Sequence, residues 1–198
     1  MNEPNPTPIR SQPLPEFIAM LALIFAVIAF SIDSMLPALP QIAAELSPGN
    51  VNRAQLVLTA FVAGMGIGLL VAGPLSDTLG RKPVITAGFA IYALAAIAAG
   101  FANSLEMLLV ARFVQGVGAA APRIVALALV RDLYQGREMA RITSFVMMIF
   151  IMIPALAPTL GEFIIELAGN WRAVFVAFII DDTQGNNLIL VFLNKFVE

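Results

Sequence analysis

The chain has 198 residues, of which 60% are hydrophobic and only 12% are charged, and its formal net charge is −2. A soluble domain is typically about half apolar and a quarter charged, so this composition cannot cover a water-facing surface with polar groups. The negative charge excludes a basic nucleic-acid-binding face, and the absence of cysteine and histidine excludes thiolate chemistry and the commonest metal ligand. Composition therefore predicts a lipid-embedded protein whose proton chemistry uses carboxylates.

The apolar residues form runs that are long enough to cross a bilayer. A membrane helix needs about 20 apolar residues. After a proline-rich tail at residues 1–15, which we expect to be disordered, such runs lie at about 17–36, 54–72, 83–101, 105–130 and 142–168. The sequence therefore predicts an all-α membrane protein with at least five spans.

A sixth apolar segment at residues 171–180 ends at Asp181 and Asp182, and five polar or glycine residues follow. Each aspartate at the bilayer centre costs about 2.5–3.5 kcal/mol. We therefore predict a transmembrane bundle at residues 16–180 with a sixth helix that is incomplete or atypical, and an atypical tail at residues 181–198. A truncation or frame change after Ile180 is one explanation, and a short interfacial tail that belongs to the protein is the other.

Lysine and arginine residues predict the orientation. With a cytoplasmic amino terminus, the six basic residues Arg10, Arg81, Lys82, Arg131, Arg137 and Arg141 lie on the cytoplasmic side. Arg53 and Arg172 then lie on the opposite side. Because cytoplasmic loops are enriched in basic residues, we expect the amino terminus to be cytoplasmic.

The segment at residues 73–83, GPLSDTLGRKP, carries a specific motif. It resembles the signature loop of the major facilitator superfamily, G-x-L-a-D-r-x-G-r-k, and it stands in the expected place between the second and third spans. Gly73, Asp77, Gly80, Arg81 and Lys82 occupy the matching positions, whereas Thr78 replaces the usual basic residue.

Three further stretches resemble the Bcr/CflA drug-resistance branch of that family. Residues 33–40, DSMLPALP, resemble the aspartate and twin prolines at the end of its first helix. Residues 112–118, RFVQGVG, resemble its fourth-helix arginine motif, with Arg112 and Gln115. Residues 154–161, PALAPTLG, resemble the antiporter motif of its fifth helix, with Pro154, Pro158 and Gly161, and Glu162 follows where a glycine or glutamine often stands.

The resemblance covers about residues 17–178 and implies the amino-terminal six-helix bundle of a twelve-helix transporter. It implies proton-coupled efflux of a small amphipathic drug across the bacterial inner membrane, driven by the proton gradient without a bound cofactor. The expected partners are the lipid bilayer and a second half-bundle or another copy of the chain, and no nucleic acid. The alternative is a non-transporting membrane fragment or assembly partner. We expect no enzyme activity, catalytic residue or metal site, since the sequence shows no nucleophile–base pair and no metal-ligand cluster.

Asp33 and Arg112 are the strongest candidates for proton and substrate coupling, together with Gln115. A charged residue inside a membrane is costly and usually functional. At about 1.5 Å per helical residue, Asp33 and Arg112 lie at depths that differ by only a few ångströms, so we predict that they can pair. Asp33 would then alternate between protonated and ionised forms. An ion pair that only locks two helices, or a simply hydrated Asp33, is the alternative.

The other motif residues have predicted mechanical roles. The resemblance implies that the loop residues Gly73, Asp77, Gly80, Arg81 and Lys82 form a gate, with Asp77 facing the second half of the transporter. Pro154 and Pro158 remove two backbone donors and should bend the fifth helix. Gly161 and Glu162 belong to the same helix-five motif, and Glu162 is expected near its outer end.

Overall fold

The computed structural model describes residues 14–197, and in that range the chain consists of helices without a strand. The α-helices are α1 (Leu14–Asp33), α2 (Leu39–Leu46), α3 (Leu56–Leu79), α4 (Arg81–Gly100), α5 (Leu105–Leu133), α6 (Gly136–Ala168) and α7 (Ala173–Val197). Two short 3₁₀ helices, η1 (Leu36–Ala38) and η2 (Val51–Gln55), precede α2 and α3. The predicted all-α bundle is confirmed.

Proline divides the first span. Helix α1 ends at Asp33, and Pro37 and Pro40 lie at the starts of η1 and α2. Proline has no backbone N–H to donate, so it is best tolerated in the first turn of a helix. The first apolar run is therefore a long helix followed by two short ones, rather than one helix to residue 36.

The motif segment at residues 73–83 is largely helical, and this corrects the prediction of a loop. Helix α3 continues through Pro74 to Leu79, and α4 begins at Arg81. Ser76 and Thr78 donate side-chain hydrogen bonds to carbonyl groups three or four residues earlier, so these polar residues extend the helix. Gly80, with φ of +90°, supplies the whole connection, because this backbone conformation is accessible to glycine.

Helix α7 also differs from its predicted bounds. It runs without a break from Ala173 to Val197, through the aspartates at which the sequence analysis ended it. No proline follows residue 173, and in a helix each backbone N–H and C=O is satisfied internally even where the side chains are polar. The polar segment therefore changes the surroundings of the helix and leaves its backbone intact.

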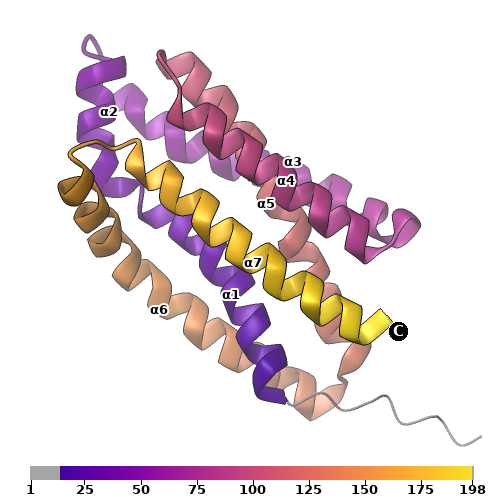
Figure 1. Cartoon of the computed structure of the whole chain (residues 1–198). Helices are drawn as coiled ribbons and strands as arrows, with labels where there is room; N and C mark the ends of the chain where they lie inside the picture. Colours follow the sequence, from indigo (N-terminus) through magenta and orange to yellow (C-terminus); the bar gives the residue numbers. More distant parts are fainter. Residues whose placement is uncertain (1–13, 198) are drawn as a thin grey trace, which may run out of the picture.

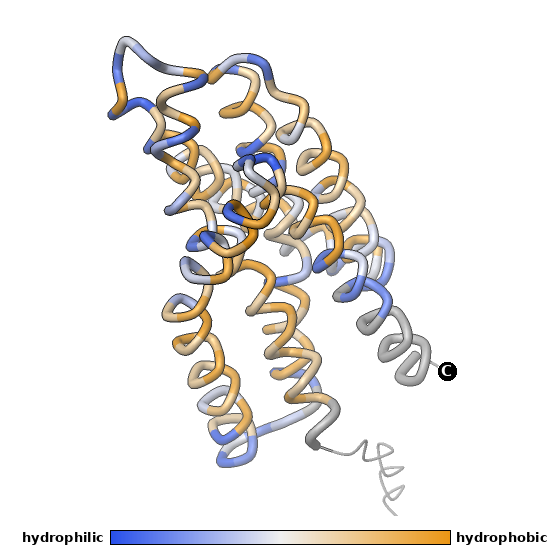
Figure 2. The backbone as a smooth tube through the Cα atoms, turned by 60° about the vertical axis from the view of Figure 1, so that its left-hand side comes forward, coloured by the Kyte–Doolittle hydropathy of each residue, from blue (hydrophilic) through white to orange (hydrophobic). Residues whose placement is uncertain are grey.

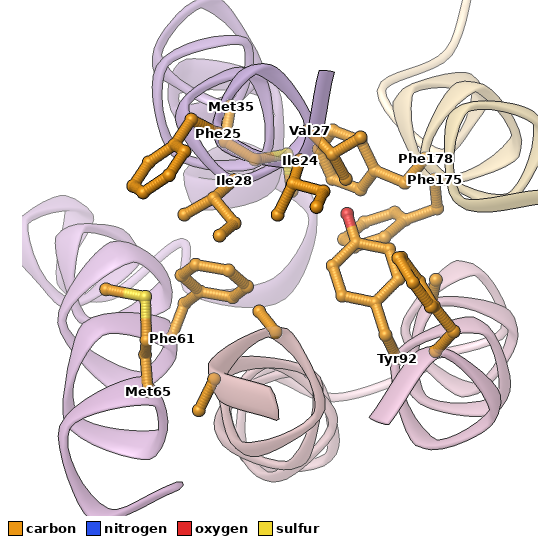
Figure 3. Close-up of a cluster of buried hydrophobic side chains, with 14 of the residues drawn as sticks. Ile24, Phe25, Val27, Ile28, Met35, Phe61, Met65, Tyr92, Phe175 and Phe178 are labelled. Carbon is orange, nitrogen blue, oxygen red and sulfur yellow. The ribbon is translucent and has the colours of Figure 1, made fainter. Parts of the chain in front are cut away.

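The helices pack as two groups that share a core. Helices α3, α4 and α5 lie side by side, α1 lies along α6, and α7 contacts both α4 and α1 (Figure 1). Between the two groups, buried side chains meet from helices α1, α3, α4 and α7 and from Met35, which lies just before η1. Ile28, Phe61, Tyr92 and Phe178 are among them (Figure 3). This shared core holds the site described below.

Among the described residues, five helical segments are long and apolar enough to cross a membrane, at Phe17–Leu46, Val51–Leu79, Arg81–Gly100, Leu105–Asp132 and Gly136–Ala168. Hydrophobic residues occupy the middle of these helices, and hydrophilic residues gather at the turns between them (Figure 2). Large apolar side chains are also exposed, especially along α6, where Ile151, Leu160 and Phe163 lie outside the core. An apolar outer surface of this kind is suited to lipid rather than water.

Candidate functional site

The centre of the bundle contains a charged side chain that has no exposed surface. Arg112, in the first half of α5, has a relative exposure of 0%. Its Nη1 donates a hydrogen bond of 2.8 Å to Oε1 of Gln115, and its Nη2 donates one of 2.9 Å to the backbone carbonyl of Ser31 on α1. Gln115 is equally buried and lies three residues along α5, on the same face of the helix.

Aromatic rings surround the Arg112 guanidinium group. Its central carbon lies 4.5 Å from the ring centroid of Phe61 on α3, 5.7 Å from that of Phe178 and 5.9 Å from that of Phe175, both on α7. The faces of aromatic rings attract cations, most strongly where water is excluded. Neutral acceptors and ring faces thus hold the charge, and Arg112 forms no ion pair with any described carboxylate.

The predicted pairing of Asp33 with Arg112 is not present. Asp33 is half-buried at the last residue of α1, and the α1 group that Arg112 contacts belongs to Ser31. Successive helical residues are rotated by about 100°, so Ser31 and Asp33 point to nearly opposite faces of α1. The face of α1 that meets α5 therefore carries Ser31.

A polar network links Arg112 to a third helix. The Ser31 hydroxyl contacts the Tyr92 hydroxyl of α4 at short hydrogen-bond distance and donates a 2.7 Å hydrogen bond to the carbonyl of Val27. Two polar atoms of the site, Nε of Arg112 and Nε2 of Gln115, have no hydrogen-bond partner. Since buried donors are normally satisfied, these two atoms leave the site free to accept another partner.

Close backbone contacts fix Arg112 relative to α3. A Cβ atom added at Gly64 would lie 2.0 Å from the carbonyl oxygen of Phe113, and one added at Gly116 would lie 2.0 Å from that of Phe61. Gly68 is also in close contact with α5, whereas nothing lies within 4 Å of a Cβ at Gly66. The glycines on one face of α3 therefore set the distance between the two helices that hold Phe61 and Arg112.

The predicted gating residues gather at one end of α3, α4 and α5. Arg81 forms an ion pair with Asp132 near the end of α5, a residue that the sequence analysis did not single out. Asp77 is exposed in the last turn of α3, and no ion pair or hydrogen bond of its side chain occurs among the described residues. A Cβ atom added at Gly73 would lie 3.5 Å from the Ile124 side chain of α5, and Lys82 lies in the first turn of α4.

The helix-five motif lies on α6, which continues through both of its prolines. Gly161 contacts the end of α1, because a Cβ atom there would lie 2.3 Å from the carbonyl oxygen of Ser34. Pro154 and Glu162 are exposed, and Pro158 is half-buried. Gly161 thus brings this motif against the backbone at the end of the helix that carries Asp33.

A polar cluster at the opposite end of the bundle was not predicted. Trp171 donates a 2.7 Å hydrogen bond from Nε1 to Glu45, and Arg172 lies 2.7 Å from the same carboxylate. Arg172 also donates a 2.9 Å hydrogen bond to the carbonyl of Ala102. The three residues join the ends of α2, α4 and α7, and their positions beside helix termini were the only sequence signal for them.

The family comparison decides the class of protein to which this site belongs. Residues 21–180 match the family model of the Major Facilitator Superfamily. The chain belongs to this superfamily. The fold, the buried arginine of its fourth span and the signature segment at residues 73–83 agree with that assignment, and they make the chain a multi-pass membrane protein of a transporter family.

Curated relatives carry names that refer to drug resistance. The chain is 36% identical over 159 residues to a "Bicyclomycin resistance protein homolog" of Haemophilus influenzae, covering 80% of this chain and 39% of that protein. It is 38% identical over 150 residues to the "Multidrug resistance protein MdtL" of Citrobacter koseri, covering 75% of this chain and 37% of that protein. An "Uncharacterized MFS-type transporter YdgK" of Bacillus subtilis is 34% identical over 172 residues, which cover 86% of this chain and 42% of that protein.

These alignments confirm the predicted resemblance to the drug-resistance branch, and they extend over only part of each relative. The chain spans about two fifths of the length of these relatives.

Proposed function

We propose that this chain forms the amino-terminal bundle of a proton-coupled exporter of small amphipathic drugs in the bacterial inner membrane, with its amino terminus in the cytoplasm. The superfamily assignment supports a transport role, and the names of the relatives support drug efflux. The observation that carries the proposal is the wholly buried Arg112, held by Gln115 and a backbone carbonyl without a carboxylate.

Asp33 is the proposed proton carrier. It lies two residues from the backbone group that Arg112 contacts, on another face of the same helix. A change at the end of α1 that turned Asp33 toward Arg112 would favour the ionised carboxylate, since an opposite charge stabilises it. In apolar surroundings away from Arg112 the protonated form would be favoured instead. Proton uptake and release would then follow the movement of α1.

Contacts around α1 support such movement. The end of α1 meets α6 at Gly161, and α6 contains Pro154 and Pro158 in its interior. Helices interrupted by proline bend more readily at these positions. In transporters of this kind, one bundle moves against another around a site near the middle of the membrane.

The second bundle is the main requirement of this proposal. We propose that a separate half-bundle or a second copy of the chain supplies it, and that exposed Asp77 faces this partner. The coverage of the relatives supports a two-bundle arrangement, because about three fifths of each relative lies outside the alignment.

The same coverage supports an alternative function. One bundle forms only part of the wall of an alternating-access site, so the chain alone would be a membrane protein without transport activity. In that case it would act as an assembly partner or have no role in efflux.

Drug susceptibility distinguishes these functions. The chain would be expressed in bacteria that lack their main exporters, alone and together with the carboxyl-terminal half of the H. influenzae relative. The proposal predicts raised resistance to a drug such as bicyclomycin in at least one arm, and loss of that resistance in Asp33→Asn. Glu166→Gln is the matched control, because it neutralises an exposed carboxylate of α6 outside the site.

Membrane levels of each variant would be measured in the same cells. Unchanged resistance in Asp33→Asn would contradict the assigned role of Asp33. Sensitivity in both arms, with normal membrane insertion, would favour the non-transporting alternative.

A further inference from the structure

Helix α7 places a carboxyl group inside the bundle at a position where no cation meets it. Asp182 has a relative exposure of 4%, although it belongs to the polar segment at residues 181–187. Its Oδ1 is fully buried and has no hydrogen-bond partner among the residues that the structure describes. Asp182 lies just beyond the residues that match the family model, which end at residue 180.

A second unsatisfied oxygen lies one turn further along the same face. Oδ1 of Asn186 is also buried without a partner. Residues four apart on a helix are neighbours, so the side chains of Asp182 and Asn186 can reach each other. Both atoms are acceptors and neither offers a hydrogen. A single proton between them would satisfy both.

The surroundings of Asp182 favour a neutral carboxyl group. It borders a cavity lined by apolar side chains of α1, α4 and α5 and by Tyr92 and Pro122. The cavity has about 10 Å³ of space for the centre of a water molecule, which is about the minimum for one water. A drug-sized ligand therefore cannot reach Asp182 by this route.

The charged and titratable groups around Asp182 do not neutralise it. Tyr92 faces it from α4, Arg112 lies beyond on α5, and Asp181 precedes it on α7. Asp181 is itself an acid, and Asp182 forms no ion pair with any described residue. Described residues of α1 and α6 place no charged group against it. An unpaired carboxylate in a dry interior is far more costly than a protonated one.

We propose that Asp182 is a proton-binding site: in the folded bundle its carboxyl group holds a proton taken from solvent, and this O–H donates a hydrogen bond to the side-chain oxygen of Asn186. The neighbouring Asp181 has a different environment. It is half-exposed and lines, with Gln184, a groove of about 470 Å³ between α1, α6 and α7. The two adjacent carboxyl groups thus face the outside and the inside of the bundle.

Unfolding in detergent tests this site directly. The unfolded chain exposes Asp182 to water and releases the proton at neutral pH, so the folded state binds one more proton than the unfolded state. Stability must then fall as the pH rises. We expect the unfolding midpoint of the purified 198-residue chain, followed by the fluorescence of its single tryptophan Trp171, to fall by about 5 °C between about pH 5 and about pH 8.

Two variants assign the effect to one residue. Asp182→Asn removes the titrating group and keeps its shape, so we expect it to abolish most of this pH dependence. Asp181→Asn makes the same change at the adjacent, half-exposed position, and we expect it to keep most of the pH dependence, whereas Asp182→Asn loses most of it. If Asp182→Asn fails to fold, the unmodified chain still tests the proposal, because its unfolding midpoint must fall as the pH rises.

Other outcomes overturn the proposal. A midpoint that does not change with pH, or one that rises with pH, would show that Asp182 is ionised in the folded bundle, with Arg112 as the nearest source of compensation. A slope that persists in Asp182→Asn or disappears in Asp181→Asn would assign the proton elsewhere. The last outcome compares two salts at the same high pH. An unfolding midpoint that is higher in a sodium salt than in a choline salt would show that the two oxygens bind a metal cation instead.

Discussion

Helices α3 and α5 meet through close backbone contacts, whereas α1 and α6 pack mainly through side chains, such as Phe25 against Phe150, with one close backbone approach at Gly161. In the first pair, Gly64, Gly68 and Gly116 leave no room for a Cβ atom. In the second pair only Gly161 is this close to the neighbouring helix, and two prolines precede it on α6. Much of α6 is exposed, including the large side chains of Met148 and Ile151.

This difference in packing between the α3–α5 and α1–α6 contacts divides the site into a fixed part, which is held in place, and an adjustable part, which can move. Close backbone packing resists displacement, because side chains cannot rearrange to relieve a clash with a main chain. Arg112 belongs to the fixed part, since its neighbours Phe113 and Gly116 contact α3 directly. Asp33 belongs to the adjustable part, at the end of α1 beside Gly161. A coupling mechanism needs both a fixed charge and a movable one.

The largest expected effect is at the α3–α5 contact. We expect Gly64→Ala to destabilise the bundle by about 3 kcal/mol, which corresponds to a midpoint lowered by about 10 °C, because the new methyl group clashes with the carbonyl of Phe113. Gly66→Ala is the matched control on the same helix, where the methyl group meets open space. Thermal unfolding in detergent measures both variants. Equal unfolding midpoints would contradict the claim that the backbone contact at Gly64 fixes α3 against α5.

An intermediate effect is expected at the α1–α6 contact. Gly161→Ala places a methyl group against the carbonyl of Ser34, but the end of α1 and the exposed α6 can move apart. We therefore expect a loss of about 1–2 kcal/mol. If this variant is destabilised as strongly as Gly64→Ala in the same assay, the α1–α6 contact is as rigid as the α3–α5 contact.

The smallest effect is expected on the outer face of α6. Met148 is exposed on this face. We expect Met148→Ala to change the stability by less than about 0.5 kcal/mol, as for other substitutions outside a core. A large loss would show that Met148 packs against another chain under the conditions of the measurement.

The sequence was sufficient to predict which segments are helices that can span a membrane, because this depends on the distribution of apolar residues along the chain. Apolar length located the five spans, and the motif residues of α5 and α6 lie on the helices where they were expected. The burial of Arg112 also followed from its position within an apolar run. Predicting these properties requires only the position of a residue along its apolar segment.

The errors concern rotation about a helix axis and the local continuity of helices. Asp33 was expected to face Arg112, yet Ser31 does, because the rotation of α1 is set by packing against α5, α6 and α7. Gly80 alone makes the turn for which a longer loop was predicted. Asp182 was read as the start of a tail, although a helix can bury a polar side chain when its neighbours supply a closed environment.

The central proposal is that Asp33, positioned near the fixed charge of Arg112, couples drug export to proton movement. It is tested most directly by proton flux in proteoliposomes that contain the chain together with its partner bundle, with a drug added under an imposed pH gradient. The account predicts drug-dependent proton movement that is lost in Asp33→Asn and retained in Glu166→Gln. Drug-dependent proton movement of normal size in Asp33→Asn would contradict it.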